Sequence, residues 1–159
     1  MKLTTILLAC VVLLGGCASP RSLVVGQSTD ADVRAVAGTP TDTRVDRNGD
    51  RVYEYATGPE GYATYIVRIG ADGKVKEVTQ ALTEDQLANV APGKTTREEV
   101  RDLLGRPTYE DVYLGIPSWS WRFAKDGMRP GFIVVTFNPD GTVRDKIAIV
   151  DFSGDGRDQ

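Results

Sequence analysis

Few residues of this 159-residue chain could perform catalysis. The chain contains two cysteines, Cys10 and Cys17, and no histidine. Histidine is the commonest general base and the commonest zinc ligand, and the usual Ser/His/Asp and Cys/His arrangements also require it. The sequence therefore predicts neither a catalytic centre nor a bound cofactor, and it indicates a protein that is not an enzyme.

One acidic segment could in principle hold a metal ion. Asp46, Asn48 and Asp50 place oxygen atoms at alternate positions, as in a calcium-binding loop. Arg51 stands where such a loop needs glycine, and Thr57 stands where it needs the closing glutamate. An Asn-Gly hairpin turn between two strands fits this segment better, so we predict no metal site.

The first residues have the features of a secretory signal. Lys2 precedes an apolar run, and small residues follow it. The run is too short to span a bilayer, which needs about 20 apolar residues. The sequence Leu14-Gly15-Gly16-Cys17 resembles the bacterial lipobox. That resemblance implies removal of residues 1–16, attachment of a diacylglycerol to the Cys17 thiol, and acylation of the new amine, for example by palmitate.

The lipid would decide where the protein lies. Two or three acyl chains anchor a protein stably at a membrane without spanning it. By the sorting rule of enteric bacteria, Ala18 implies the outer membrane, where the mature chain would face the periplasm. Because Cys10 leaves with the signal and Cys17 carries lipid, the mature chain has no thiol for a disulfide. A net charge of −3 without a basic block argues against nucleic acid as a partner.

Two segments of the chain carry the same pattern. Residues Gly26–Thr41 and Gly93–Thr108 align without a gap. Each predicts a short helix that begins after a threonine N-cap, carries an apolar stripe, and ends at a glycine followed by a proline. In the second copy Thr96 and Glu99 can form a full capping box, whereas Asp32 makes the first copy a weaker version.

Antiparallel strands should follow each helix. Alternating apolar residues bounded by turn residues predict strands at 41–47, 51–56, 62–69, 74–80, 108–114, 118–124, 132–137 and 142–152. A second short helix is expected at 83–89. The predicted fold class is α+β, with two tandem repeats of a short helix, or helix pair, and about four antiparallel strands. The expected organisation is a signal peptide (1–16), a lipidated tether (17–24), a first repeat (25–81), a second repeat (82–152) and a flexible tail (153–159).

A row of aromatic residues allows two interpretations. Trp119, Trp121 and Phe123 alternate along one predicted strand and share a face, and Tyr53 and Tyr55 match them in the first repeat. We expect most of the row to form the core beneath the helices, with a tyrosine or tryptophan at its rim. The alternative is an aromatic patch on an exposed sheet face, where rigid aromatic side chains favour protein partners.

In the second copy the repeated pattern is carried by Gly93, Thr95, Glu98, Val100, Gly105 and Pro107. This pattern resembles that of a known family, the SmpA/OmlA (BamE-like) small outer-membrane lipoproteins. The first copy carries the pattern too, although Ala31 stands where the second copy has Glu98. The tandem layout is similar to the β-lactamase inhibitor protein fold. The family resemblance implies support of the machine that inserts β-barrels into the outer membrane.

We therefore expect an outer-membrane lipoprotein that acts by binding proteins, as a non-catalytic scaffold in envelope or outer-membrane protein assembly. The alternative is an inhibitor-like protein that binds a periplasmic or foreign enzyme. The expected partners are the membrane, through the lipid anchor, and envelope proteins such as the assembly machinery. The residues expected to contact a protein partner are Tyr109, Tyr113, Trp119, Met128 and Arg129.

Overall fold

The computed structural model describes residues 19–57, 62–125 and 128–150. The expected signal peptide, the lipid-bearing Cys17 and the tail from residue 153 lie outside the described residues. Within the described ranges, no helix is both long and apolar enough to cross a membrane.

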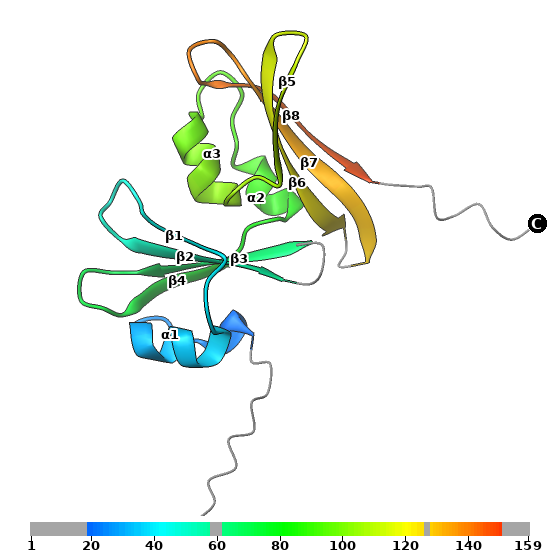
Figure 1. Cartoon of the computed structure of the whole chain (residues 1–159). Coiled ribbons are helices and arrows are strands. Elements are labelled where there is room, and N and C mark those ends of the chain that lie inside the picture. Colours follow the sequence, from blue (N-terminus) through cyan, green and yellow to red (C-terminus); the bar gives the residue numbers. More distant parts are fainter. Residues whose placement is uncertain (1–18, 58–61, 126–127, 151–159) are drawn as a thin grey trace, which may run out of the picture.

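Each half of the chain consists of helices followed by a four-stranded antiparallel sheet, which confirms the predicted α+β class in two tandem halves (Figure 1). The helix expected at 83–89 is α2. The first half contains η1 (Pro20–Ser22), α1 (Asp30–Ala37), β1 (Asp42–Val45), β2 (Arg51–Thr57), β3 (Ala63–Ile69) and β4 (Val75–Gln80). The second half contains α2 (Glu84–Ala88), α3 (Arg97–Leu104), β5 (Tyr109–Tyr113), β6 (Ile116–Lys125), β7 (Arg129–Phe137) and β8 (Val143–Val150).

Both main helices begin with a full capping box. In α1 the Thr29 side chain accepts a hydrogen bond from the backbone N–H of Asp32, and Asp32 Oδ2 accepts one from the backbone N–H of Thr29 at 2.8 Å. Thr96 and Glu99 make the same pair of contacts at α3. The expectation of a weaker cap at Asp32 is therefore wrong, because the shorter carboxylate still reaches its partner N–H.

The hairpin loops explain how the two halves differ in length. Between Asp46 and Asp50, which are joined by a backbone hydrogen bond, the β1–β2 loop has three residues and ends in Gly49, whose φ is 83°, so the predicted Asn-Gly hairpin is confirmed. The corresponding β5–β6 turn has two residues, Leu114 and Gly115, with φ of 50° and 77°. The strand β6 consequently begins at Ile116, whereas the sequence predicts a turn through residues 115–117.

The elements form four layers, with α1 at one end and the second sheet (β5–β8) at the other (Figure 1). The helix α1 covers one face of the first sheet (β1–β4), where Val33 packs with Tyr53, Tyr55 and Val67. The helices α2 and α3 lie between the sheets and cover one face of the second sheet. That core consists mainly of Leu87, Val100, Leu104, Trp121, Phe123, Ile133, Val135 and Phe137.

The aromatic row lies in the core, which confirms the preferred interpretation. Trp121 and Phe123 are each 1% exposed, and Tyr53 and Tyr55 are buried beneath α1. Trp119 is half-buried at the rim, with its ring edge-to-face against Trp121 at 6.3 Å between centroids. The face of β6 that carries Trp121 and Phe123 is therefore more buried than its opposite face, as the alternation of apolar and polar residues predicts.

The packed body begins earlier than the boundary predicted at residue 25. Ser19 caps η1, Pro20 is buried, and Leu23 belongs to the core of the first half. Part of the segment expected to be a tether is therefore packed against α1.

We predict that Gly38→Ala and Gly105→Ala each lower the free energy of unfolding by about 1–3 kcal/mol, because both end a helix in a backbone region nearly restricted to glycine. A Cβ at Gly105 would also lie 3.1 Å from Glu54 Oε2, whereas a Cβ at Gly38 would meet nothing within 4 Å. Gly105→Ala should therefore destabilise more in urea unfolding followed by tryptophan fluorescence. Equal losses would contradict a tight contact between α3 and the first sheet.

Candidate interaction surfaces

A buried carboxylate lies where α3 meets the first sheet. Glu54, on β2, is only 2% exposed. Its Oε1 accepts hydrogen bonds from Arg44 Nε at 3.3 Å and from Arg101 Nη1, and its Oε2 accepts one from the backbone N–H of Arg106 at 2.8 Å. A buried charge is tolerated when it is paired and hydrogen-bonded, and two arginines and an N–H meet that requirement here.

Arginines of the first sheet also cap the last turn of α3. Arg44 Nη2 donates to the carbonyl oxygen of Arg101 at 3.2 Å, and Arg68 Nη2 donates to that of Asp102 at 2.7 Å. The last carbonyls of a helix have no partner within the helix and carry partial negative charge. The two guanidinium groups therefore hold this helix end against the sheet.

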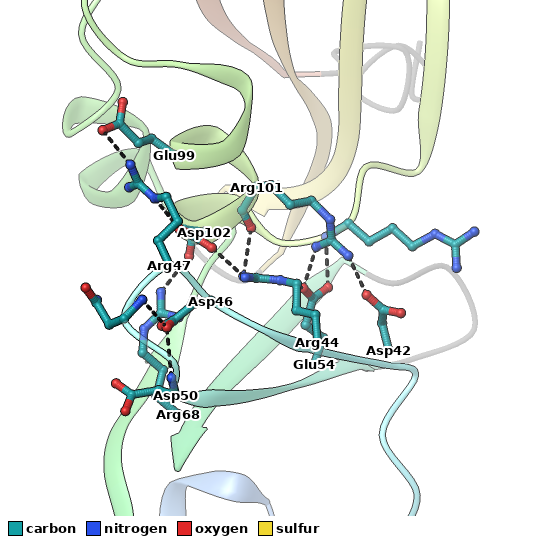
Figure 2. A network of polar contacts seen from close by, with 12 residues as sticks. Asp42, Arg44, Asp46, Arg47, Asp50, Glu54, Arg68, Glu99, Arg101 and Asp102 are labelled. Atoms are coloured by element: carbon teal, nitrogen blue, oxygen red, sulfur yellow. Dashed lines mark hydrogen bonds and ion pairs between the residues drawn. The ribbon is translucent and has the colours of Figure 1, made fainter. Parts of the chain in front are cut away.

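Further ion pairs extend the contact along β1 and its loop (Figure 2). We call the contacts of Glu54 and Arg68 with α3, together with the ion pairs given at the end of this paragraph, the seam. Such pairs add little net stability after desolvation, but another orientation of α3 would leave several charges unpaired. The seam therefore fixes the orientation of the two halves. These pairs join Arg44 to Asp102, Arg101 to Asp42, and Arg47 to both Glu99 (3.2 Å) and Asp102 (3.4 Å).

Two hollows flank the seam. The larger, of about 490 Å³, is lined by residues that include Arg68, Lys94 and Glu99. The smaller, of about 270 Å³, is bordered by Arg97 and Trp119 among others. Both hollows mix acidic and basic side chains, so neither presents a single charge to a ligand. Among the residues that the structure describes, no three His, Cys, Asp or Glu side chains gather into a metal site.

In the acidic segment that could hold calcium, the carboxylates of Asp46 and Asp50 already have partners within the first sheet and its loop. Asp46 Oδ1 accepts hydrogen bonds from the backbone N–H groups of Asn48 at 2.9 Å and Asp50 at 3.0 Å. Asp50 Oδ2 accepts one from Lys76 Nζ at 2.6 Å. The carboxylates therefore stabilise the hairpin.

The structure does not gather the residues that the sequence offers as partner contacts. Tyr109 and Tyr113 lie on β5, an edge strand of the second sheet, and both are exposed. Met128 and Arg129 are also exposed, but they lie beside the end of β6, whereas Tyr113 lies beside its beginning. Trp119 points to the opposite face from Tyr109, toward the core. The five residues therefore do not form one site, and partner contact at each stays a prediction.

Sequence reasoning missed the seam. Glu54 stands between Tyr53 and Tyr55, and alternation assigns it to the solvent side of a sheet that is covered on one face. The only signal is the alternating charge of Asp42 and Arg44 along β1. Alternating charges of this kind are equally compatible with a strand face that is exposed to solvent and with one that contacts a charged helix.

Glu99 links the cap of α3 to the seam. Its carboxylate accepts hydrogen bonds from the backbone N–H of Thr96 and from Arg47, and these contacts hold the pKa of Glu99 below its ordinary value of 4.5. The contact with Glu99 also raises the pKa of Arg47 above its ordinary value. Both groups are therefore charged at neutral pH.

We predict that Glu54→Gln lowers the free energy of unfolding by about 3 kcal/mol, near the lower end of the range for breaking a buried ion pair. The expected loss of stability is near the lower end of that range because Arg44 still pairs with Asp102, and Arg101 still pairs with Asp42. Urea unfolding followed by circular dichroism measures the change.

The matched control for that variant is Ser120, which occupies on β6 the position that Glu54 occupies on β2. Ser120→Ala should change the free energy of unfolding by less than about 0.5 kcal/mol, because Ser120 belongs to no ion-pair network. A loss at Glu54 no larger than the loss at Ser120 would contradict the role of the seam.

We predict that acid destabilises the fold partly through Glu99. Because its pKa is lower in the folded chain, Glu99 contributes stability that is complete above its unfolded value and is lost as the pH falls through the folded value. Glu99→Gln should therefore show a smaller loss of the urea midpoint between about pH 5 and about pH 3 than the wild type.

Added salt distinguishes the two contacts of Glu99, because it weakens the ion pair with Arg47 more than the hydrogen bond from Thr96. The ion pair with Arg47 is exposed, so added salt at neutral pH should weaken the wild type more than Glu99→Gln. Asp32, whose pKa is lowered by hydrogen bonds from Thr29, is the control. If Asp32→Asn and Glu99→Gln responded alike to both acid and salt, the link between Glu99 and the first sheet would be disproved.

A comparison with known proteins identifies a family for the second half of the chain. Residues 80–158 match the family model of the outer membrane protein assembly factor BamE domain. The match begins at the last residue of β4 and includes α2, α3 and the whole second sheet. Neither the curated proteins nor the solved structures give a significant match, so likeness to the β-lactamase inhibitor fold stays a prediction. Residues 80–158 of this chain therefore belong to the BamE/SmpA-like family.

Proposed function

We propose that this protein is a non-catalytic binding module, or scaffold, in outer-membrane protein assembly. The observation that carries the proposal is the BamE domain at residues 80–158, because that domain is named for an outer-membrane assembly factor. A family of assembly factors suggests a role other than catalysis, and a chain without histidine agrees with binding.

The proposal includes a lipid anchor in the outer membrane, with the folded body on the periplasmic side. It is supported by the lipobox that ends at Cys17 and by Ala18 after it. The packed body begins at Pro20. Three residues span at most about 10 Å, so a lipid on Cys17 would hold the first half close to the membrane surface.

The inhibitor-like alternative has less support. It depended on an exposed aromatic sheet face, and the row that could have formed one is mostly in the core. Trp121 and Phe123 pack against α2 and α3, and Trp119 borders them. We therefore retain assembly as the proposed function.

Deleting the gene should lower the levels of outer-membrane β-barrel proteins and increase sensitivity to detergent, because a component of assembly would be missing. Immunoblots of envelope fractions and growth on detergent measure the two effects. Re-expression of the wild-type chain should restore both. Unchanged barrel levels together with an intact permeability barrier would overturn the proposal.

The two cysteines provide a matched test of the anchor within the same experiment. Cys17→Ser should abolish labelling by radioactive palmitate and fail to restore barrel levels, because the lipid has no attachment point. Cys10→Ser, inside the expected signal, should be labelled and restore both. Labelling of Cys17→Ser would show that the anchor is assigned to the wrong residue.

A further inference from the structure

The turn between β5 and β6 differs from the three other hairpin turns that the structure describes in full. In each of those three, an aspartate side chain accepts a backbone hydrogen bond of the turn, and a glycine takes the positive φ. In the β5–β6 turn, Leu114 takes a φ of 50°. Within the described ranges it is the one residue other than glycine with a positive φ, and it is 83% exposed.

Leu114 costs folding free energy and contributes little to it in return. In the left-handed region a leucine Cβ lies too close to the backbone, and asparagine or glycine is favoured at this position of a two-residue turn. Because the side chain is exposed, it also buries little apolar area. Residues held in unfavourable backbone conformations concentrate at functional sites. Leu114 therefore points to a role outside folding.

The residues before Leu114 extend the apolar surface of this hairpin end. Val112 and Tyr113 are 70% and 73% exposed, so three consecutive large apolar residues lie in water. Val112 and Tyr113 point to opposite sides of the strand, and the hairpin end therefore presents apolar atoms on both sides. A concave partner surface can cover both sides at once, whereas a flat one cannot.

The turn lies away from the expected lipid anchor. The 3-10 helix η1, where the described chain begins, and the β5–β6 turn are at opposite ends of the molecule (Figure 1). An anchor at Cys17 would hold the η1 end at the membrane, so the turn would point into the periplasm. The carboxylates of Glu110 and Asp111 beside the turn also disfavour an anionic bilayer surface.

These two carboxylates indicate the charge of a protein partner. Glu110 and Asp111 are exposed, and neither pairs with a basic side chain among the described residues. Carboxylates at the edge of a contact favour a partner that places lysine or arginine opposite them. A second copy fits less well, because its smaller hollow would bring Glu98 and Asp102 toward these carboxylates.

We propose that the β5–β6 turn is a docking tip, which inserts Leu114 into an apolar pocket of another envelope protein whose rim carries basic side chains. Val112 and Tyr113 contact the walls of that pocket, and Glu110 and Asp111 meet its rim. A few side chains that fill pockets supply most of the binding energy of a protein interface. The inference rests on the proposed function, since it names a contact of the same module.

The variant Leu114→Asn separates docking from folding. It removes the apolar side chain and supplies the residue that this turn favours, so the urea midpoint should rise above that of the wild type. The matched control is Val25, which is aliphatic, lies in a turn and is 55% exposed in the first half. Val25→Asn should give no such rise. A midpoint for Leu114→Asn at or below the wild-type value would contradict the cost that the argument assigns to Leu114.

Photocrosslinking in living cells measures docking on the full-length, lipidated chain. A benzophenone side chain at Tyr113 should give an adduct with one envelope protein, at a peptide that combines apolar residues with lysine or arginine. Leu114→Asn should reduce the adduct at least tenfold although it stabilises the fold. Leu114→Met, which keeps an apolar side chain, and Val25→Asn should both retain it. An undiminished adduct in Leu114→Asn would overturn the proposal.

Isolated envelopes allow the charges at the rim to be tested. Added salt should lower the yield of the adduct, because exposed charges are screened. Glu110→Gln combined with Asp111→Asn should lower the yield at low salt and reduce its dependence on salt. Equal yields and equal salt responses in this variant and the wild type would disprove the basic rim, and with it the proposed partner.

Other results of the crosslinking would also overturn the proposal. An adduct with a second copy would indicate self-association, and one with residues 151–159 of the same chain would indicate an internal occupant. Labelled lipid without protein would indicate a membrane surface. The absence of any adduct at Tyr113 would indicate that the turn is free in the cell.

The outcome is separable from that of the proposed function. If gene deletion lowers barrel levels and the adduct at Tyr113 does not depend on Leu114, the docking tip is wrong and the assembly role stands. If deletion leaves barrels unchanged while the adduct forms and is lost in Leu114→Asn, the assembly role is wrong and the docking tip stands.

Discussion

The burial of Glu54 between the two halves is the contact on which the rest of the arrangement depends. The carboxylate leaves water because Arg44 from its own sheet, Arg101 from α3 and the backbone N–H of Arg106 all donate to it. Displacing α3 would leave an unpaired charge in the interior, which costs far more than the pair contributes. The helix therefore has one favourable orientation on the first sheet. That orientation decides which face of the second sheet remains uncovered.

Gly105 joins this ionic contact to the apolar core. With no side chain, it leaves room for Glu54 Oε2, and its φ of 78° turns the chain directly after α3. Its carbonyl accepts the indole N–H of Trp121 at 3.1 Å, so the same residue satisfies a polar group in the core of the second half. The helix end, the seam and the Trp121 side chain are thus positioned together.

Local rules predict most of this fold, because helix caps, apolar stripes and glycine stops lie within a few residues of each other. The β5–β6 turn is displaced from its predicted place because Leu114 takes a positive φ of 50°, which is rare for such a residue. The exposure of Tyr113 and Met128 could be predicted, since both lie close to chain reversals. Their separation depends on sheet register, and the seam joins residues far apart in the sequence. Neither the separation of these two residues nor the contacts of the seam follow from the local sequence pattern.

Ser120 stands on the second sheet where Glu54 stands on the first, and this difference does more than remove a charge. Identical charged faces would let α1 of one copy compete for the second sheet of another, and such a head-to-tail contact does not close. With Glu54 on one sheet only, the arginine of a helix such as α3 meets a buried carboxylate on the first sheet, whereas Ser120 stands at the equivalent place on the second. The charged face thus selects its helix by ion pairing. Two faces of the same topology therefore differ in the helix that they hold, because the ion partners of the first are not repeated on the second.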